Sequence, residues 1–456
     1  MSATLQERTA GGAAPLAPPR IFRWLVLIVI SLAMFGNYYV YDCISPLADV
    51  LKEKLSFTDD DIGMLNAIYS IPNIFMVLIG GIVIDRLGVK RSLLLFSGIC
   101  MVGAGLTAAT GTFSMMAAGR LLFGLGAESL IVAVTASIAR WFSGKELSFA
   151  FGINLTIARL GSFAALNSPT WAKQLYGGWQ WPLLLAAVFG LVSAIAALSY
   201  WVMESYAGRR YELSQSTTDK VVWRDLFRFG RSYWFVVALC VTFYSAIFPF
   251  QTFAVKFFME AHSTSRELGG FLSSMLTLFA MIFTPLFGLL VDRVGRRSAF
   301  MMAGSLLIVP VYLAMAYTRS SVWLEVPQLG FASSFPNLSL LLPMATMGIA
   351  FSLIPAVMWP SVAYIVDQSR LGTAYGMMTM IQNIGLAGFN LLIGRANTFA
   401  GASAANPDGY ALGMWIFSVL GLLGFLFAWL LRRNEMGPHA YGLETITVRT
   451  GNPAAG

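Results

Sequence analysis

The sequence predicts an all-α membrane protein in which twelve transmembrane helices form two pseudo-symmetric bundles of six. Three observations lead to this prediction: a very apolar composition, twelve apolar runs of membrane-spanning length, and a motif that recurs half a chain apart. Of the 456 residues, 57% are hydrophobic and only 11% are charged. Soluble proteins average about 25% charged residues. A chain with so few charges lacks the surface that water requires, so lipid is the expected solvent.

The expected spans are apolar runs bounded by charges or by Gly/Pro breaks, because a transmembrane helix needs roughly 20 apolar residues. The run after Arg23 is too long for the core of a signal peptide, so we expect it to remain as the first span. The spans are predicted at residues 23–50, 60–84, 92–112, 115–139, 147–168, 180–203, 233–257, 267–291, 298–318, 338–366, 371–394 and 410–431.

A single long polar connection separates the spans into two groups. The predicted domains are a disordered N-tail at 1–22, an N-terminal bundle at 23–203, a linker at 204–232, a C-terminal bundle at 233–431 and a C-tail at 432–456. The side with both termini and the linker carries 21 Lys and Arg residues, and the opposite side carries seven. Because cytoplasmic loops are enriched in Lys and Arg, we expect both termini and the linker in the cytoplasm.

The net charge of +8 therefore reflects membrane orientation. Zinc-ligand spacing and a basic helix are both missing from the sequence, so nucleic acid is not an expected partner. The three cysteines each lie in an apolar run, which argues against a disulfide framework.

A motif follows the second span and returns after the eighth, displaced by 207 residues. A weaker repeat joins the fifth and eleventh spans, where Ala150-Phe151-Gly152 corresponds to Ala374-Tyr375-Gly376 at an offset of 224. Repeats at half the chain length are typical of transporters built from duplicated bundles. The first copy of the motif includes Gly81, Asp85, Arg86, Gly88 and Arg91, and the second includes Gly288, Asp292, Arg293, Gly295 and Arg297.

These two copies of G-xxx-D-R-x-G, together with the pattern R-xxx-G-x-G at Arg120, resemble the major facilitator superfamily. The resemblance implies the fold of that family and motif loops that latch the two bundles in one state. An Asp at a helix end can pair with a cation on a neighbouring helix only while the cytoplasmic side is closed. The expected pairs are Asp85 with Arg140 and Asp292 with Arg370. The alternative is that the basic residues of the motif only set topology.

Four ionisable residues within the expected spans are candidates for a site, because a charge at mid-membrane costs at least ~2.5–3.5 kcal/mol and needs a cavity or a partner. At about 1.5 Å per residue, Asp42 and Arg120 are predicted near the outer rim. By the same estimate Glu128 and Arg159 lie roughly 18 and 20 Å from the cytoplasmic ends of their spans. The two are therefore level near the bilayer centre, where such transporters bind substrate.

The repeat places neutral Asn383 opposite Arg159, so the two halves differ in charge at the expected site. A guanidinium can bind a carboxylate in a bidentate way, and a carboxylate can bind an ammonium group, so the pair suits a zwitterion. Two alternatives remain open: an ion pair that only joins the two spans, or a proton carried by Glu128. Polar and aromatic candidates in the C-terminal half are Tyr244, Gln251, Trp359, Gln382 and Asn383.

Four segments resemble the lysosomal dipeptide-transporter branch of the superfamily: 36–42, 69–73, 126–130 continuing to 144–159, and 371–376. The resemblance implies that Glu128 and Arg159 contact the ends of a peptide and that transport is facilitative. Tyr38, Asp42 and Tyr69 match the branch and are candidate binding residues without an assigned role. The N-tail has no acidic dileucine sorting signal, so a plasma or bacterial inner membrane is the expected location.

The predicted function is a secondary transporter of small zwitterions, most simply dipeptides, that works by alternating access as a monomer without a cofactor. An ATP-driven pump is excluded because no GxxxxGK[ST] loop exists. The only histidines, His262 and His439, lie outside the spans, so neither an intramembrane enzyme nor a metal site is expected. The alternatives are a proton-coupled organic-anion or sugar-acid carrier, which calls for a second cation beside Arg159, and a membrane sensor that does not transport.

Overall fold

The computed structural model describes residues 18–142, 146–211, 229–318, 338–367, 370–438 and 440–446. The expected N-tail up to residue 17, most of the linker and the C-tail after residue 446 lie outside the described residues. The described chain is almost entirely helical. Eleven helices are long and apolar enough to cross a membrane, or twelve with the bent helix α3 counted as one span. The prediction of an all-α membrane protein with two bundles is confirmed.

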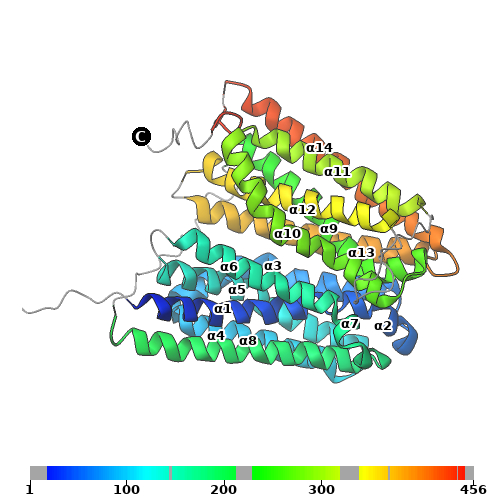
Figure 1. The fold of residues 1–456 in the computed structure, drawn as a ribbon, viewed down its shortest axis with the longest axis horizontal. Helices are drawn as coiled ribbons and strands as arrows, with labels where there is room; N and C mark the ends of the chain where they lie inside the picture. Colours follow the sequence, from blue (N-terminus) through cyan, green and yellow to red (C-terminus); the bar gives the residue numbers. More distant parts are fainter. Residues whose placement is uncertain are drawn as a thin grey trace, which may run out of the picture.

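Two bundles of six long helices lie one above the other in Figure 1. The first contains α1 (Arg20–Asp42), α3 (Asp59–Leu87), α4 (Val89–Ala109), α5 (Phe113–Trp141), α6 (Leu147–Leu166) and α8 (Gln180–Ala207). The second contains α9 (Arg231–His262), α10 (Arg266–Val294), α11 (Arg297–Tyr317), α12 (Leu338–Ile365), α13 (Leu371–Phe399) and α14 (Ala411–Glu435). The short elements are η1 (Ser45–Leu47), α2 (Ala48–Leu55), α7 (Ser168–Trp171), η2 (Lys173–Gly177) and η5 (Pro407–Tyr410).

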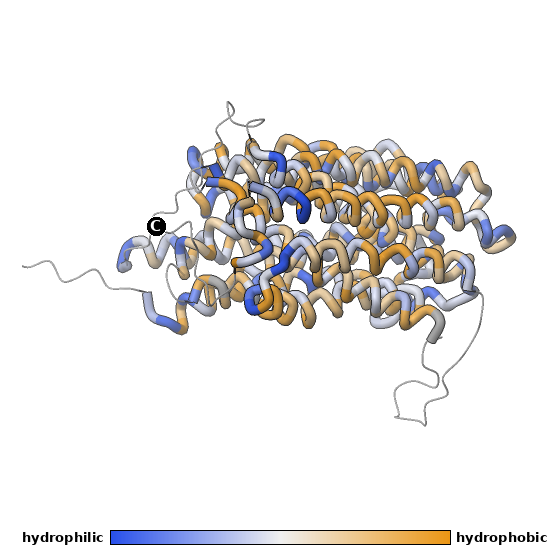
Figure 2. The backbone as a smooth tube through the Cα atoms, turned by 90° about the horizontal axis from the view of Figure 1, so that it is seen from above, coloured by the Kyte–Doolittle hydropathy of each residue, from blue (hydrophilic) through white to orange (hydrophobic). Residues whose placement is uncertain are grey.

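The long helices form because their apolar runs leave the backbone no other hydrogen-bond partner in lipid. Figure 2 shows hydrophobic residues along the middle of the molecule and hydrophilic residues gathered mostly at its two ends. Local signals set the helix starts. Thr58 and Asp61 form a capping box at the start of α3, and the Ser265 side chain accepts a hydrogen bond from Leu268 N at the start of α10.

The expected run at 23–50 lies within one continuous span, Arg20–Leu55, which contains a short 3-10 turn. Helix α1 ends at Asp42, and the chain continues through η1 into α2. Pro46 explains the break, because it has no backbone N–H to donate to the carbonyl four residues earlier, at Asp42. The polar end of α1 therefore lies inside the molecule.

We call the end of the molecule where α1 begins and α14 ends the tail end, and the opposite end the far end (Figure 1). Part of the expected C-tail is folded onto the tail end. Arg296 N and Arg297 N donate to the carbonyls of Glu444 and Leu443, at 3.1 and 3.2 Å, and Leu443 is fully buried. These bonds satisfy backbone donors at the start of α11 that have no partner within the helix.

Candidate functional site

A cavity of about 290 Å³ lies between the two bundles, halfway along them. It is lined by residues of both bundles, including polar groups that are rare in membrane interiors. All nine residues predicted for substrate binding lie in its wall: Tyr38, Asp42, Tyr69, Glu128, Arg159, Tyr244, Trp359, Gln382 and Asn383. The sequence thus located the residues that surround this space.

Glu128 on α5 and Arg159 on α6 are the charged residues that the depth estimate placed level with each other. Both side chains are half-buried and face the cavity. Within the described residues, no Lys or Arg lies within 4 Å of the Glu128 carboxylate, and no carboxylate lies within 4 Å of the Arg159 guanidinium. The ion pair that would only join α5 to α6 does not form, so both groups are available to a ligand.

Asp42 also lines the cavity, although the depth estimate placed it near the outer rim. It is the last residue of α1, and its side chain is buried. Arg120, by contrast, does not line the cavity. Its fully buried guanidinium donates to Val40 O at 3.1 Å and to Asn66 Oδ1 at 2.8 Å. Arg120 therefore satisfies a carbonyl at the end of α1 and ties that end to α3.

The wall contributed by the C-terminal bundle is neutral. Trp359 Nε1 donates to Tyr244 Oη at 2.9 Å, and Tyr375 Oη donates to Trp359 O at 3.1 Å. Asn383 Nδ2 donates to Thr379 O at 3.0 Å, whereas its buried Oδ1 accepts no hydrogen bond from the described residues. This wall therefore offers aromatic rings and neutral amide groups to a ligand.

Two aromatic residues close the cavity toward the far end, and the sequence analysis did not single them out. The rings of Tyr41 on α1 and Phe248 on α9 meet edge to face across the bundles, with centroids 6.2 Å apart. Helical spacing could have revealed them, since Tyr41 follows Tyr38 by three residues and Phe248 follows Tyr244 by four. Each therefore shares a helix face with a residue that was predicted.

The chain matches the family described as Major Facilitator Superfamily over residues 30–260 and 249–445. The chain belongs to the major facilitator superfamily. The lysosomal dipeptide transporter MFSD1 of Danio rerio is 32% identical to it over 83% of this chain and 82% of that protein. The Mus musculus protein of the same name is 31% identical over 92% and 89% of the two chains.

A solved structure has the same fold as this major facilitator chain. It is the crystal structure of a bacterial homologue of the human lysosomal transporter Spinster, in an inward-facing and occupied conformation. It aligns with a TM-score of 0.70 at 16% identity, and the alignment covers 91% of this chain and 98% of the other. At this identity the likeness concerns the fold alone.

In this member of the superfamily, ion pairs join the bundles at the far end. Lys256 on α9 has no exposed surface and lies 2.7 Å from Asp59 on α3. Arg266 on α10 pairs with Asp49 on α2. Further pairs join Lys173 to Glu267 and Lys52 to Glu260. The far end is therefore closed in this conformation.

Close backbone approach completes the closure. A Cβ atom added at Gly63 on α3 would come within 2.5 Å of Asn390 O on α13. One added at Gly394 on α13 would come within 2.5 Å of Asp59 O on α3. Real Cβ atoms do not tolerate such distances, so α3 and α13 can meet here only because both positions are glycine.

The two motif loops lie at the tail end, and their structures explain part of the motif. Gly88 has φ +79° and Gly295 has φ +70°, a backbone region that favours glycine. The expected partners differ. Arg140 pairs with Glu204 of its own bundle at 2.5 Å, and Asp85 is exposed with no described Lys or Arg within 4 Å.

The second loop differs from the first. Asp292 pairs with Arg297 at 2.9 Å, within the motif itself. The Arg370 guanidinium lies over the ring of Phe229, 4.8 Å from its centroid. Neither expected latch contact is formed among the described residues of this conformation. The latch stays a prediction.

Proposed function

We propose that this chain carries dipeptides and similar zwitterions across a membrane by alternating access. The observation that carries the proposal is the separation of Glu128 and Arg159, two opposite charges that border one cavity without neutralising each other. A free peptide has an ammonium group at one end and a carboxylate at the other. The relatives named above, which are called dipeptide transporters, support the same substrate class.

The charge balance of the cavity weakens the alternative of an organic dianion or sugar acid. Among the described residues that line the cavity, Arg159 is the only cation, whereas Asp42 and Glu128 are both acidic. A dianion would bring two negative charges to a wall that already holds more acids than bases. A dipeptide brings one charge of each sign, and transport occurs by facilitated diffusion or with a proton.

The far-end closure supplies one state of the transport cycle. In the other state the bundles rotate about the cavity, the far end opens and the tail end closes. The substrate must bind similarly in both states so that neither state traps it. From the distribution of Lys and Arg we propose that the tail end is cytoplasmic, in a plasma or bacterial inner membrane.

The test is flux of a labelled dipeptide into proteoliposomes, measured with and without a pH gradient. Uptake is expected to saturate, and its dependence on the pH gradient distinguishes uniport from proton coupling. Competition then identifies the groups that are recognised. An unmodified dipeptide should compete, whereas its N-acetylated and C-amidated forms should compete weakly, because each lacks one charge.

The matched variants assign each charge to a residue. Glu128→Gln should lose its preference for the free amine over the N-acetylated form, and Arg159→Gln should lose its preference for the free carboxylate over the amide. Leu160→Val serves as the control, since Leu160 is exposed beside Arg159 and does not line the cavity. If the wild-type protein moves monocarboxylates but no dipeptide, the proposed substrate class is wrong.

A further inference from the structure

Arg159 makes an unusual contact for a buried cation in a membrane. Its guanidinium carbon lies 4.9 Å from the centroid of the Phe351 ring. Arg159 belongs to α6 of the first bundle and Phe351 to α12 of the second, so the contact crosses the cavity seam. No described residue gives this guanidinium a salt bridge or a hydrogen bond, which leaves the ring as its described partner.

A ring face holds a guanidinium differently from a carboxylate. The attraction comes from the negative face of the π system, on which a guanidinium can stack with its flat side. The five N–H donors of arginine lie in the guanidinium plane and point outward from its edge. A ring contact forms no hydrogen bond with the N–H donors, so they stay available, whereas an ion pair with Glu128 would occupy the donors that a substrate needs.

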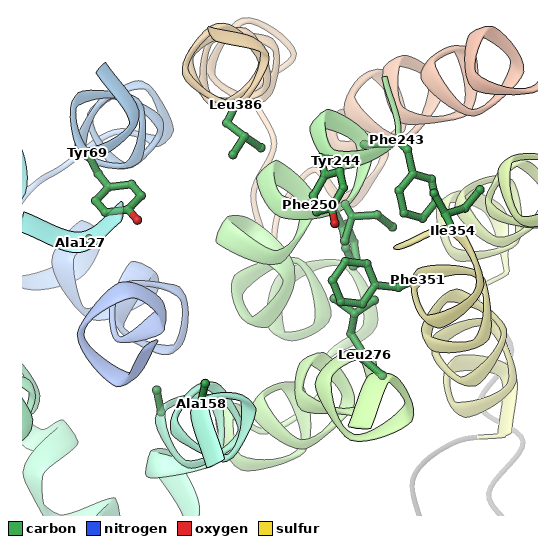
Figure 3. Close-up of a cluster of buried hydrophobic side chains, with 14 of the residues drawn as sticks. Tyr69, Ala127, Ala158, Phe243, Tyr244, Phe250, Leu276, Phe351, Ile354 and Leu386 are labelled. Atoms are coloured by element: carbon green, nitrogen blue, oxygen red, sulfur yellow. The ribbon is translucent and has the colours of Figure 1, made fainter. Parts of the chain in front are cut away.

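Phe351 is itself held rigidly. Its side chain is 1% exposed, and it packs in a cluster with Phe243, Tyr244 and Phe248. The ring of Phe248 meets it edge to face at 5.9 Å. Figure 3 shows Tyr244 and Phe351 close together on the side of the second bundle, across the gap from Tyr69. Phe351 lies outside the cavity lining, so it backs Arg159 without being a wall of the site.

We propose that Phe351 is a positioning residue for Arg159, which fixes the plane of the guanidinium so that its N–H edge faces the carboxylate of the substrate. This inference rests on the proposed function, because it assigns Arg159 to a carboxylate. It also gives the second bundle a part in binding a charge, although that bundle contributes no charge to the cavity wall.

The test replaces Phe351 by phenylalanines with one, two and three ring fluorines, which weaken the negative ring face while keeping nearly the same shape. We expect the KM for a dipeptide to rise stepwise, by about 3- to 10-fold over the series, with the maximal rate little changed. The KM for a C-amidated dipeptide should stay constant. The same series at Phe243, in the same cluster but without a described contact to Arg159, is the control.

A simpler pair of variants asks whether the ring is needed. Phe351→Leu removes the ring and should raise the KM, and Phe351→Tyr, which keeps it, should restore most of the affinity. A purely structural role predicts instead that the KM values for dipeptide and amide rise together, or that fluorination has no effect. Either of these results overturns the proposal.

A second readout needs no dipeptide. Phenylglyoxal modifies free guanidinium groups, and peptide mass spectrometry can report its rate at Arg159. This rate should increase along the fluorine series at Phe351 and stay constant along the series at Phe243. If wild-type protein does not transport dipeptides but labelling follows the series, the substrate class fails and the positioning role stands. If transport works and both series are flat, only the positioning role fails.

Discussion

The two bundles contribute unequal chemistry to one cavity. The first supplies the charges, with Asp42, Glu128 and Arg159 on three different helices. The second supplies aromatic rings and neutral amides, among them Trp359 and Asn383. The contrast is sharpest at the position that the internal repeat relates, where a guanidinium on α6 corresponds to an amide on α13.

This difference shows how a duplicated scaffold can specialise. Both bundles keep the motif loop with its left-handed glycine, because closing and opening need both halves. Recognition of charge needs only one half. Each charge at mid-membrane costs free energy. Charged residues in one bundle, placed where the ligand can neutralise them, therefore cost less free energy than charged residues in both bundles. The second bundle can then contact the uncharged part of a substrate.

The largest expected effect tests the charged half directly. Glu128→Gln or Arg159→Ala leaves one charged end of a bound dipeptide without its partner. Losing one partner of a desolvated charge pair costs about 2–5 kcal/mol, or roughly 30- to several thousand-fold in affinity. Dipeptide flux at low concentration should therefore fall by at least about 30-fold in either variant.

Protein amount in the membrane and the elution profile of each purified variant serve as controls for folding. Both should match the wild type, because neither side chain has an ion-pair partner among the described residues. Flux at the wild-type rate in either variant would remove the charged half from substrate binding.

The second-largest effect is expected at the far end, where each bundle contributes one helix with a glycine to the close contact between α3 and α13. Gly394→Ala on α13 would place a methyl group against the Asp59 carbonyl of α3 and prevent their close approach. We expect the far end to open. Gly388→Ala is the matched control on the same helix, because no atom lies within 4 Å of its added Cβ.

Spin labels at Thr110 and Ala404, both exposed at the far end, can report the opening as a distance. The distribution should shift to longer values in Gly394→Ala and should not change in Gly388→Ala. The three native cysteines are buried, which limits unwanted labelling. An unchanged distribution in Gly394→Ala would mean that the glycine contact does not hold the far end closed.

The sequence predicted the fold and the charged wall well because both follow from short-range rules. Run length gives the spans, and rise per residue places Glu128 level with Arg159. The same rule placed Asp42 toward the outer rim, and the structure shows that this carboxylate also lines the cavity.

Contacts between distant residues could not be predicted in this way. Lys256 and Asp59 are 197 residues apart and meet only because the bundles close at the far end. No feature of the sequence indicated that Lys256, near the end of its expected span, would be fully buried. In this conformation Arg140 pairs instead with Glu204 on the neighbouring α8, a contact that the sequence did not indicate.

A smaller effect is expected in the neutral half. Asn383→Ala removes a buried amide oxygen of this wall that has no described hydrogen-bond partner, without removing a charge. A neutral hydrogen bond contributes about 0.5–1.5 kcal/mol, so the KM for a dipeptide should rise by about 2- to 10-fold. Initial-rate flux over a range of dipeptide concentrations measures this. If Asn383→Ala reduced dipeptide flux as much as Arg159→Ala does, the two bundles would share substrate recognition more evenly than their charges indicate.

The smallest effect compares the two motif copies. Asp292→Asn removes the partner of the buried Arg297, although Tyr364 remains beside that guanidinium. Because the Asp292 side chain is 47% exposed, solvent screens the pair, and its loss should cost about 1 kcal/mol or less. For a chain of this length the melting temperature should then fall by roughly 1–2 °C.

Asp85→Asn is the counterpart in the first copy and should leave the melting temperature unchanged, since no described cation lies near that carboxylate. Its effect should be on the conformational equilibrium instead. If Asp85 latches the closed tail end, its removal favours the open tail end, and labels at Leu87 and Val294 should report longer distances. If the distance distribution does not change in Asp85→Asn, the first motif loop only sets the topology. The two motif loops would then differ in function, as the two walls of the cavity differ in charge.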